Sequence, residues 1–277
     1  MNTPASELHV AAVQTALHWE DAQANRRHFS AIFRQLMSED AAPKPDLIVL
    51  PEMFSTGFSM APERLAEQPA GPTTQWMQEQ AALHNAVITG SIIVTENGNY
   101  YNRLIWAEPD GTVKHYNKRH LFRMGNEDKH YTAGTEKLIV ELKGWKVCPL
   151  ICYDLRFPVW SRNTFKANNN EAPTADYDLL LYVANWPEVR SHIWHVLLRA
   201  RAIENQAYVV GINRIGNDGN NVPHDGLSDI MNFTGDSLRS ADYNSPDVLR
   251  TSLSYENLLL FRKNFPAGLD ADAFELK

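Results

Sequence analysis

The chemistry that this sequence could carry centres on its two cysteines, Cys148 and Cys152, which stand four residues apart. In an extended strand their Cα atoms would lie about 13 Å apart, beyond the roughly 7 Å limit for a disulfide, and the spacing is not that of a zinc knuckle. Cys148 lies within an apolar run, and we interpret it as a small core residue. Cys152 ends that run, at a predicted turn from strand to helix where a nearby cation and the helix terminus favour ionisation of a thiol. From the residues alone, Cys152 is either a nucleophile or an inert buried thiol.

A cysteine nucleophile needs a base, a group that stabilises the oxyanion and a proton for the leaving group. Glu52 directly follows a buried apolar run, which suits general acid–base work, although an exposed loop carboxylate fits the same pattern. Lys118 lies just past a predicted strand and is either a fixed charge near the oxyanion or a solvated surface lysine. Glu127 lies in a polar loop and taken alone indicates nothing.

Other kinds of catalytic site find less support. His192 and His195 stand at i, i+3 on a predicted helix, but no third ligand has suitable spacing, so we interpret the pair as structural. His224 lies near Ser228 and Asp229, yet the Gly-x-Ser-x-Gly elbow of many serine hydrolases is absent. Neither common Gly-rich phosphate loop occurs. The sequence therefore favours cysteine chemistry over these alternatives.

Strand-like and helix-like segments alternate along the chain and must position these residues. The pattern predicts a single mixed α/β domain over residues 1–277, with functional groups at strand ends. We interpret residues 217–226, rich in Gly and Asn, as an exposed loop. Predicted strands cover residues 8–15, 46–50, 86–95, 100–107, 112–116, 137–141, 145–152, 177–184, 207–215 and 247–253, and predicted helices cover 21–37, 73–85, 189–206 and 255–261.

Composition narrows the class of protein. With 44% hydrophobic and 21% charged residues, the chain is globular rather than disordered or collagen-like. Its 26 Lys and Arg against 33 Asp and Glu give a net charge of −7, which argues against nucleic-acid binding. The first residues do not resemble a signal peptide, and the longest apolar run is far shorter than a membrane span. We expect a cytoplasmic protein that binds neither nucleic acid nor membrane.

Several segments together resemble the carbon–nitrogen hydrolase (nitrilase) superfamily, and within it the omega-amidase branch. LPEMFSTGF at residues 50–58 resembles the segment of the catalytic glutamate, YNKRHLF at 116–122 the lysine segment, and LICYDLRFP at 150–158 the nucleophile elbow. Ala184 to Pro187 and the helix that follows are also similar to this family. The resemblance extends from the first predicted strand to about Gly235 and is weakest beyond it.

The resemblance implies a four-layer α-β-β-α sandwich that dimerises through helices. It implies a catalytic triad of Glu52, Lys118 and Cys152, with Glu127 as the second glutamate that many members carry. The backbone N–H of Tyr153 would join the lysine ammonium in holding the oxyanion. The implied reaction is acyl transfer to sulfur followed by hydrolysis, which requires no metal or organic cofactor.

The resemblance also implies a substrate class, the small ω-amides of α-keto dicarboxylates, such as α-ketoglutaramate and α-ketosuccinamate. Phe58, Phe122 and Trp186 would form the walls of a narrow acyl pocket, although core packing explains them equally. Arg156 would bind a distal carboxylate or form a structural ion pair. Two alternatives stay open: an amidase of another specificity, acting on deaminated glutathione or a carbamoyl compound, and a non-catalytic binding protein with the same fold.

Overall fold

A computed structural model describes residues 4–38, 43–169 and 171–276. The first of its two main sheets has the strand order β16-β1-β2-β3-β4-β5. β1 pairs with β2 and β2 with β3 in parallel, whereas β16, β4 and β5 pair antiparallel with their neighbours. Its strands are β1 (Glu7–Gln14), β2 (Leu47–Val49), β3 (Val87–Glu96), β4 (Asn99–Ala107), β5 (Val113–Asn117) and β16 (Asp247–Ser254).

The second main sheet has the order β15-β14-β11-β10-β7-β6. β10 lies between β7 and β11, parallel to both, and every one of its residues is buried. A continuous apolar run is what such a strand needs, because both of its faces are covered. The strands are β6 (Val140–Leu142), β7 (Trp145–Ile151), β10 (Leu179–Ala184), β11 (Tyr208–Asn213), β14 (Asp229–Met231) and β15 (Ser237–Ser240).

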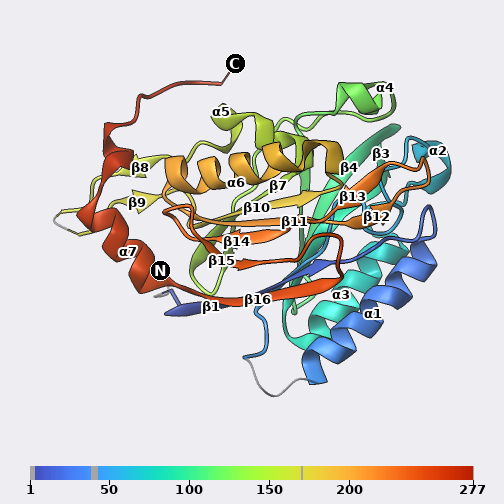
Figure 1. The fold of residues 1–277 in the computed structure, drawn as a ribbon, viewed down its shortest axis with the longest axis horizontal. Coiled ribbons are helices and arrows are strands. Elements are labelled where there is room, and N and C mark those ends of the chain that lie inside the picture. The colour runs from blue at the N-terminus through green and yellow to red at the C-terminus, as the bar shows by residue number, and fades with distance from the viewer. Residues whose placement is uncertain (1–3, 39–42, 170, 277) are drawn as a thin grey trace.

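The two sheets stack face to face, and helices cover their outer faces (Figure 1). Strand β1 shows how the layers are joined: Leu8 and Val10 contribute to the core shared with the second sheet, whereas Ala11 and Val13 face the outer helices. The helices on that side are α1 (Ala22–Ser38) and α3 (Pro72–His84), and α5 (Pro158–Ser161) and α6 (Ser191–Asn205) cover the other sheet. This confirms the predicted α-β-β-α sandwich.

Short elements complete the fold, several of them directly after strands. They are α2 (Pro62–Leu65), η1 (Arg123–Gly125), α4 (Glu127–His130), η2 (Cys152–Arg156), β8 (Phe165–Lys166), β9 (Thr174–Ala175), η3 (Glu188–Arg190), β12 (Ile215–Asn217), β13 (Pro223–Asp225), α7 (Tyr255–Asn264) and η4 (Ala267–Asp270). None of the helices in the described ranges combines the length and the apolar character that crossing a membrane requires.

The structure corrects two local predictions. The strand predicted over residues 137–141 starts only at Val140, since residues 135–139 have no strand partner. Residues 217–226, predicted as an exposed loop, include part of the β12–β13 hairpin, in which His224 and Asp225 are buried. Polar composition misled the prediction because polar residues at this end of the hairpin find partners in the interior. The His224 Nδ1 bonds to the Val222 carbonyl at 3.0 Å, and one oxygen of Asp225 accepts the Ser191 hydroxyl.

Candidate active site

Cys152 stands at a sharp elbow where β7 ends and η2 begins. Its backbone has φ of 43°, in the left-handed region, which turns its side chain out of the strand. The Sγ lies 4.0 Å from the backbone oxygen of Asn185, at the end of the neighbouring strand β10. The residue is 8% exposed, whereas Cys148 on the same strand is fully buried. The structure therefore separates the two thiols as predicted.

Glu52 is fully buried in the turn that follows β2. Its Oε2 accepts the backbone N–H of Asn185 at 2.7 Å, and its backbone oxygen accepts the Asn185 side-chain amide. The next residue, Met53, has positive φ, as Cys152 does, and donates its N–H to the Ser91 hydroxyl at 2.8 Å. Contacts to both sheets thus fix the carboxylate between the carboxyl ends of β2 and β10.

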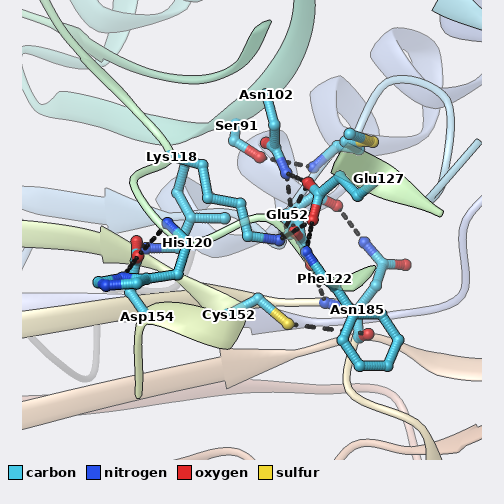
Figure 2. Close-up of polar contacts among 12 residues, drawn as sticks. Glu52, Ser91, Asn102, Lys118, His120, Phe122, Glu127, Cys152, Asp154 and Asn185 are labelled. Atoms are coloured by element: carbon cyan, nitrogen blue, oxygen red, sulfur yellow. Dashed lines mark hydrogen bonds and ion pairs between the residues drawn. The ribbon is translucent and has the colours of Figure 1, made fainter. Parts of the chain in front are cut away.

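Lys118 follows β5 directly and joins two glutamates (Figure 2). Its Nζ lies 2.8 Å from Oε1 of Glu52 and 2.9 Å from Oε2 of Glu127, and all three side chains are fully buried. Glu127 opens α4 and also accepts the backbone N–H of Phe122 at 2.6 Å. The four residues predicted to be catalytic therefore converge from four separate segments of the chain.

Asn102 on β4 is a further member of this cluster that the sequence did not reveal. Its Nδ2 donates to Glu52 at 2.8 Å and to Glu127 at 3.0 Å, so it bridges the two carboxylates beside the Lys118 ammonium. A side-chain amide between two buried carboxylates lowers the cost of placing two negative charges together. Asn102 is 1% exposed, which makes this bridge part of the interior.

Burial and neighbouring charges set the protonation of the cluster. Burial opposes the charge on Lys118, but the carboxylates of Glu127 and Glu52 outweigh it and raise the pKa of the ammonium. Burial raises the pKa of Glu127, with Lys118 opposing. Burial and the Glu52 carboxylate raise the pKa of the Cys152 thiol well above its usual range, although Lys118 opposes them. The expectation of favoured ionisation at Cys152 is therefore wrong, because burial and the Glu52 carboxylate oppose it.

Asp154, another residue that sequence reasoning missed, ties the lysine segment to the cysteine elbow. One carboxylate oxygen accepts the Tyr116 hydroxyl at 2.8 Å and the Ile151 N–H at 3.1 Å. The other accepts the backbone N–H of His120 at 3.0 Å and its Nδ1 at 2.7 Å (Figure 2). Since Tyr116 and His120 flank Lys118 by two residues on each side, Asp154 fixes the lysine relative to Cys152.

A cavity of about 350 Å³ opens above this cluster. Cys152 and Lys118 line its floor, and aromatic rings form its wall; the Phe122 and Tyr153 rings, for example, meet edge to face with centroids 5.1 Å apart. Arg156 lies at the cavity with its guanidinium 5.0 Å from the centre of the Trp186 ring. The substrate-binding residues predicted from sequence all line this cavity, namely Phe58, Phe122, Tyr153, Arg156 and Trp186.

The alternatives weighed from sequence do not assemble into sites. Ser228 donates its hydroxyl to Gln14 at 2.7 Å rather than to a histidine. His195 lies 3.8 Å from Asp229, and its helical neighbour His192 joins no metal-ligand cluster. Across the described ranges, we find no group of three or more His, Cys, Asp or Glu side chains placed to hold a metal ion.

Comparison with known proteins agrees with this geometry. A family model described as carbon–nitrogen hydrolase matches residues 9–259. The chain is 46% identical over 271 residues to omega-amidase YafV of Escherichia coli strain K12, covering 97% of this chain and 98% of that protein. It is 36% identical over 187 residues to 2-oxoglutaramate amidase of Bacillus subtilis strain 168, covering 66% and 69%.

A solved structure is similarly close. XC1258 of Xanthomonas campestris, a CN-hydrolase superfamily protein with an arsenic adduct in its active site, is 43% identical, with a TM-score of 0.92 over 98% of this chain and 99% of that one. The chain therefore belongs to the carbon–nitrogen hydrolase family and is a hydrolase of carbon–nitrogen bonds. Within that family it falls in the omega-amidase branch. The family match also continues past Gly235, where the resemblance was expected to weaken.

Proposed function

We propose that this enzyme hydrolyses the terminal amide of small α-keto dicarboxylic acid monoamides, α-ketoglutaramate and α-ketosuccinamate, to the acid and ammonia through a thioester on Cys152. The observation that carries the proposal is that the Cys152 thiol and the Lys118 ammonium line one cavity while two buried glutamates bind that ammonium from beneath. That set supplies a nucleophile, a fixed positive charge and a proton acceptor within one small volume.

The first half of the reaction forms the thioester. The Glu52 carboxylate takes the proton of the Cys152 thiol as the sulfur attacks the amide carbon. The Lys118 ammonium and the N–H of Tyr153 stabilise the oxyanion; removing one such donor typically costs about 10²–10³ in turnover. Tyr153 lies in the first turn of η2, where backbone N–H groups have no acceptor within the helix. Glu52 then returns its proton to the nitrogen, and ammonia leaves.

The second half hydrolyses the thioester. Glu52, again a carboxylate, takes a proton from water as the oxygen attacks the acyl carbon, and the sulfur leaves with the proton that Glu52 returns. Glu127 keeps Lys118 aimed at the oxyanion in both halves, because its two oxygens lie 2.9 and 3.1 Å from Nζ. The raised pKa of Lys118 keeps the ammonium charged throughout.

The substrate class is supported by the relatives and by the cavity wall. Two relatives carry the names omega-amidase and 2-oxoglutaramate amidase. Phe58 and Phe122, with ring centroids 6.4 Å apart, both line the cavity and give it an apolar wall that suits a short acyl chain. Arg156 would bind the distal carboxylate, since a guanidinium pairs well with a carboxylate.

Ammonia release from a panel of amides tests the function. We expect α-ketoglutaramate and α-ketosuccinamate to give the highest kcat/KM, above deaminated glutathione and carbamoyl compounds. If the α-keto ω-amides rank last, the substrate assignment is wrong and the better substrate replaces it.

Two cysteine variants test the mechanism. Cys152→Ala should fold and lose turnover, whereas Cys148→Ala, the matched control, should keep it. Intact-mass spectrometry of rapidly quenched enzyme should show the acyl adduct in the wild type and not in Cys152→Ala. Unchanged turnover in Cys152→Ala would refute the nucleophile assignment. Dimerisation through the helices and a cytoplasmic location stay predictions, the first of which light scattering can test.

A further inference from the structure

A second arginine, Arg190, belongs to the half-buried part of the cavity lining, which we call the mouth and which also includes Arg156. It ends η3, lines the same cavity as Cys152 and Lys118, and is half-buried. Its guanidinium carbon lies 5.5 Å from the centre of the Phe122 ring. Like Arg156, it forms no ion pair with any carboxylate in the part of the chain that the structure describes. Two guanidiniums thus line the cavity without an ion pair to a carboxylate of the described residues.

The backbone of Arg190 is fixed, but its side chain rests on weak partners. Its N–H donates to the Pro187 carbonyl at 3.0 Å, and its own carbonyl accepts the Trp186 indole N–H at 2.9 Å. The guanidinium donates to the Met124 sulfur at 2.9 Å. A thioether is a weak acceptor, so a carboxylate in the cavity would replace it with a stronger, charge-assisted bond.

Nearby carboxylates are already engaged elsewhere. Asp218 lines the cavity, but it accepts the N–H groups of Asn220 and Val222 at 2.8 and 2.9 Å within its own turn. Glu188, two residues before Arg190, accepts the Tyr243 hydroxyl at 2.5 Å. Neither carboxylate forms an ion pair with Arg190 in the described part of the chain, so its guanidinium is open to an acid entering from solution.

The floor gives an anionic substrate no attraction of its own. Lys118 is surrounded by the carboxylates of Glu52 and Glu127, so a single ammonium faces two acidic groups. A substrate with a carboxylate at one end and an amide at the other needs its positive partner at the end opposite the sulfur. The mouth, with Arg156 and Arg190, is where the cavity supplies that charge.

We propose that Arg190 is a second specificity-determining residue and that, together with Arg156, it binds the carboxylate at the far end of the substrate. This inference rests on the proposed function, because it presumes a substrate that carries both an amide and a carboxylate. The two arginines then act together, because both select acids over uncharged amides and both orient the amide carbon toward Cys152.

The test compares α-ketoglutaramate with pentanamide, an uncharged amide of similar length, in the wild type and in Arg190→Gln. We expect Arg190→Gln to lose roughly 10- to 100-fold in kcat/KM on the keto acid, mostly through KM, because one charged hydrogen-bond partner is removed. On pentanamide the change should stay within about threefold. Arg190→Lys should recover only part of the loss, since an ammonium cannot bind a carboxylate with two parallel bonds.

Arg34→Gln, at an exposed position of α1, is the matched control for loss of one positive charge and should leave both substrates unaffected. Thermal unfolding checks that the Arg190 variants fold. If the wild type prefers the keto acid and Arg190→Gln keeps that preference within threefold, the inference is overturned and the proposed function stands. If the wild type itself shows no preference for the keto acid, the proposed function fails and the inference fails with it.

Discussion

The charged groups at the floor of the cavity are fully buried and paired, whereas the two guanidiniums at the mouth are half-buried and form no ion pair in the part of the chain that the structure describes. At the floor, Glu52, Lys118 and Glu127 are fully buried and bound to one another. At the mouth, Arg156 and Arg190 lie against aromatic rings instead. The groups that act on the reacting atoms are thus fixed by protein contacts before the substrate binds. The groups proposed to select the substrate lack a charged partner until the substrate supplies one.

The largest expected effect comes from breaking the floor. Lys118→Met would leave two buried carboxylates without their cation, which typically costs about 3–5 kcal/mol of stability, and would remove an oxyanion donor worth about 10²–10³ in turnover. Denaturant unfolding and ammonia release measure the two effects. Lys114→Met, on the preceding strand and partly exposed in its pair with Glu108, should cost no more than about 1 kcal/mol. Equal destabilisation by the two variants would contradict a floor of buried, paired charges.

The two thiols should differ next most strongly. At neutral pH we expect iodoacetamide to alkylate Cys152 at least about 100-fold faster than Cys148, with parallel loss of activity. Burial raises the pKa of both thiols, so the difference comes from access: the Cys148 side chain is fully buried, whereas Cys152 lines the cavity. Peptide mass spectrometry over time gives both rates. Comparable labelling would mean that the elbow does not present its sulfur.

Asn102→Ala sharpens the comparison within the floor itself. Losing the amide that bridges Glu52 and Glu127 should lower kcat roughly 10- to 100-fold while KM changes little. Because the Asn102 hydrogen bond lowers the pKa of Glu127, its loss should raise that pKa further and move the acid limb of the pH–rate profile upward. Asn99→Ala, at an exposed position of the same strand, is the control. An unshifted acid limb would show that Asn102 serves packing alone.

The smallest expected effect concerns the hairpin at the rim. Burial lowers the pKa of His224 to about 4 from 6.5. Between these values the unfolded chain binds more protons than the folded one, so stability falls as pH falls through this window, by about 2 kcal/mol between pH 7.5 and pH 5. His224→Gln should remove that part of the slope in thermal unfolding across pH. An unchanged slope would show that His224 binds protons equally in the folded and unfolded states.

The sequence predicts the long elements well because their hydrophobic periodicity is strong. The helix over residues 21–37 and the strands at 8–15 and 177–184 match α1, β1 and β10 closely. Strands β14 and β15 escape prediction because each has only three or four residues. β14 pairs with β11, and the register of the β14–β15 pair shifts between Ile230 and Met231. Periodicity carries little information over three or four residues.

The candidate site divides in the same way. Glu52, Lys118, Glu127 and Cys152 could be proposed because their local segments resemble those of a family. Asn102 could not, since its two partners lie 50 and 25 residues away and nothing near it in the chain signals a role. Arg190 likewise acquires meaning only when η3 is placed at the cavity mouth. Local pattern identifies the reacting groups, and tertiary structure identifies those that position them.

The left-handed backbone at Cys152 has a consequence for the protein's tolerance of change. In that conformation a residue with a Cβ atom has a free energy about 1 kcal/mol higher than glycine. Inactive Cys152→Gly should therefore melt at a higher temperature than inactive Cys152→Ala, although glycine also loosens the unfolded chain and offsets part of the gain. The catalytic side chain at position 152 thus carries a cost in backbone strain, so stability and activity are opposed at this one position.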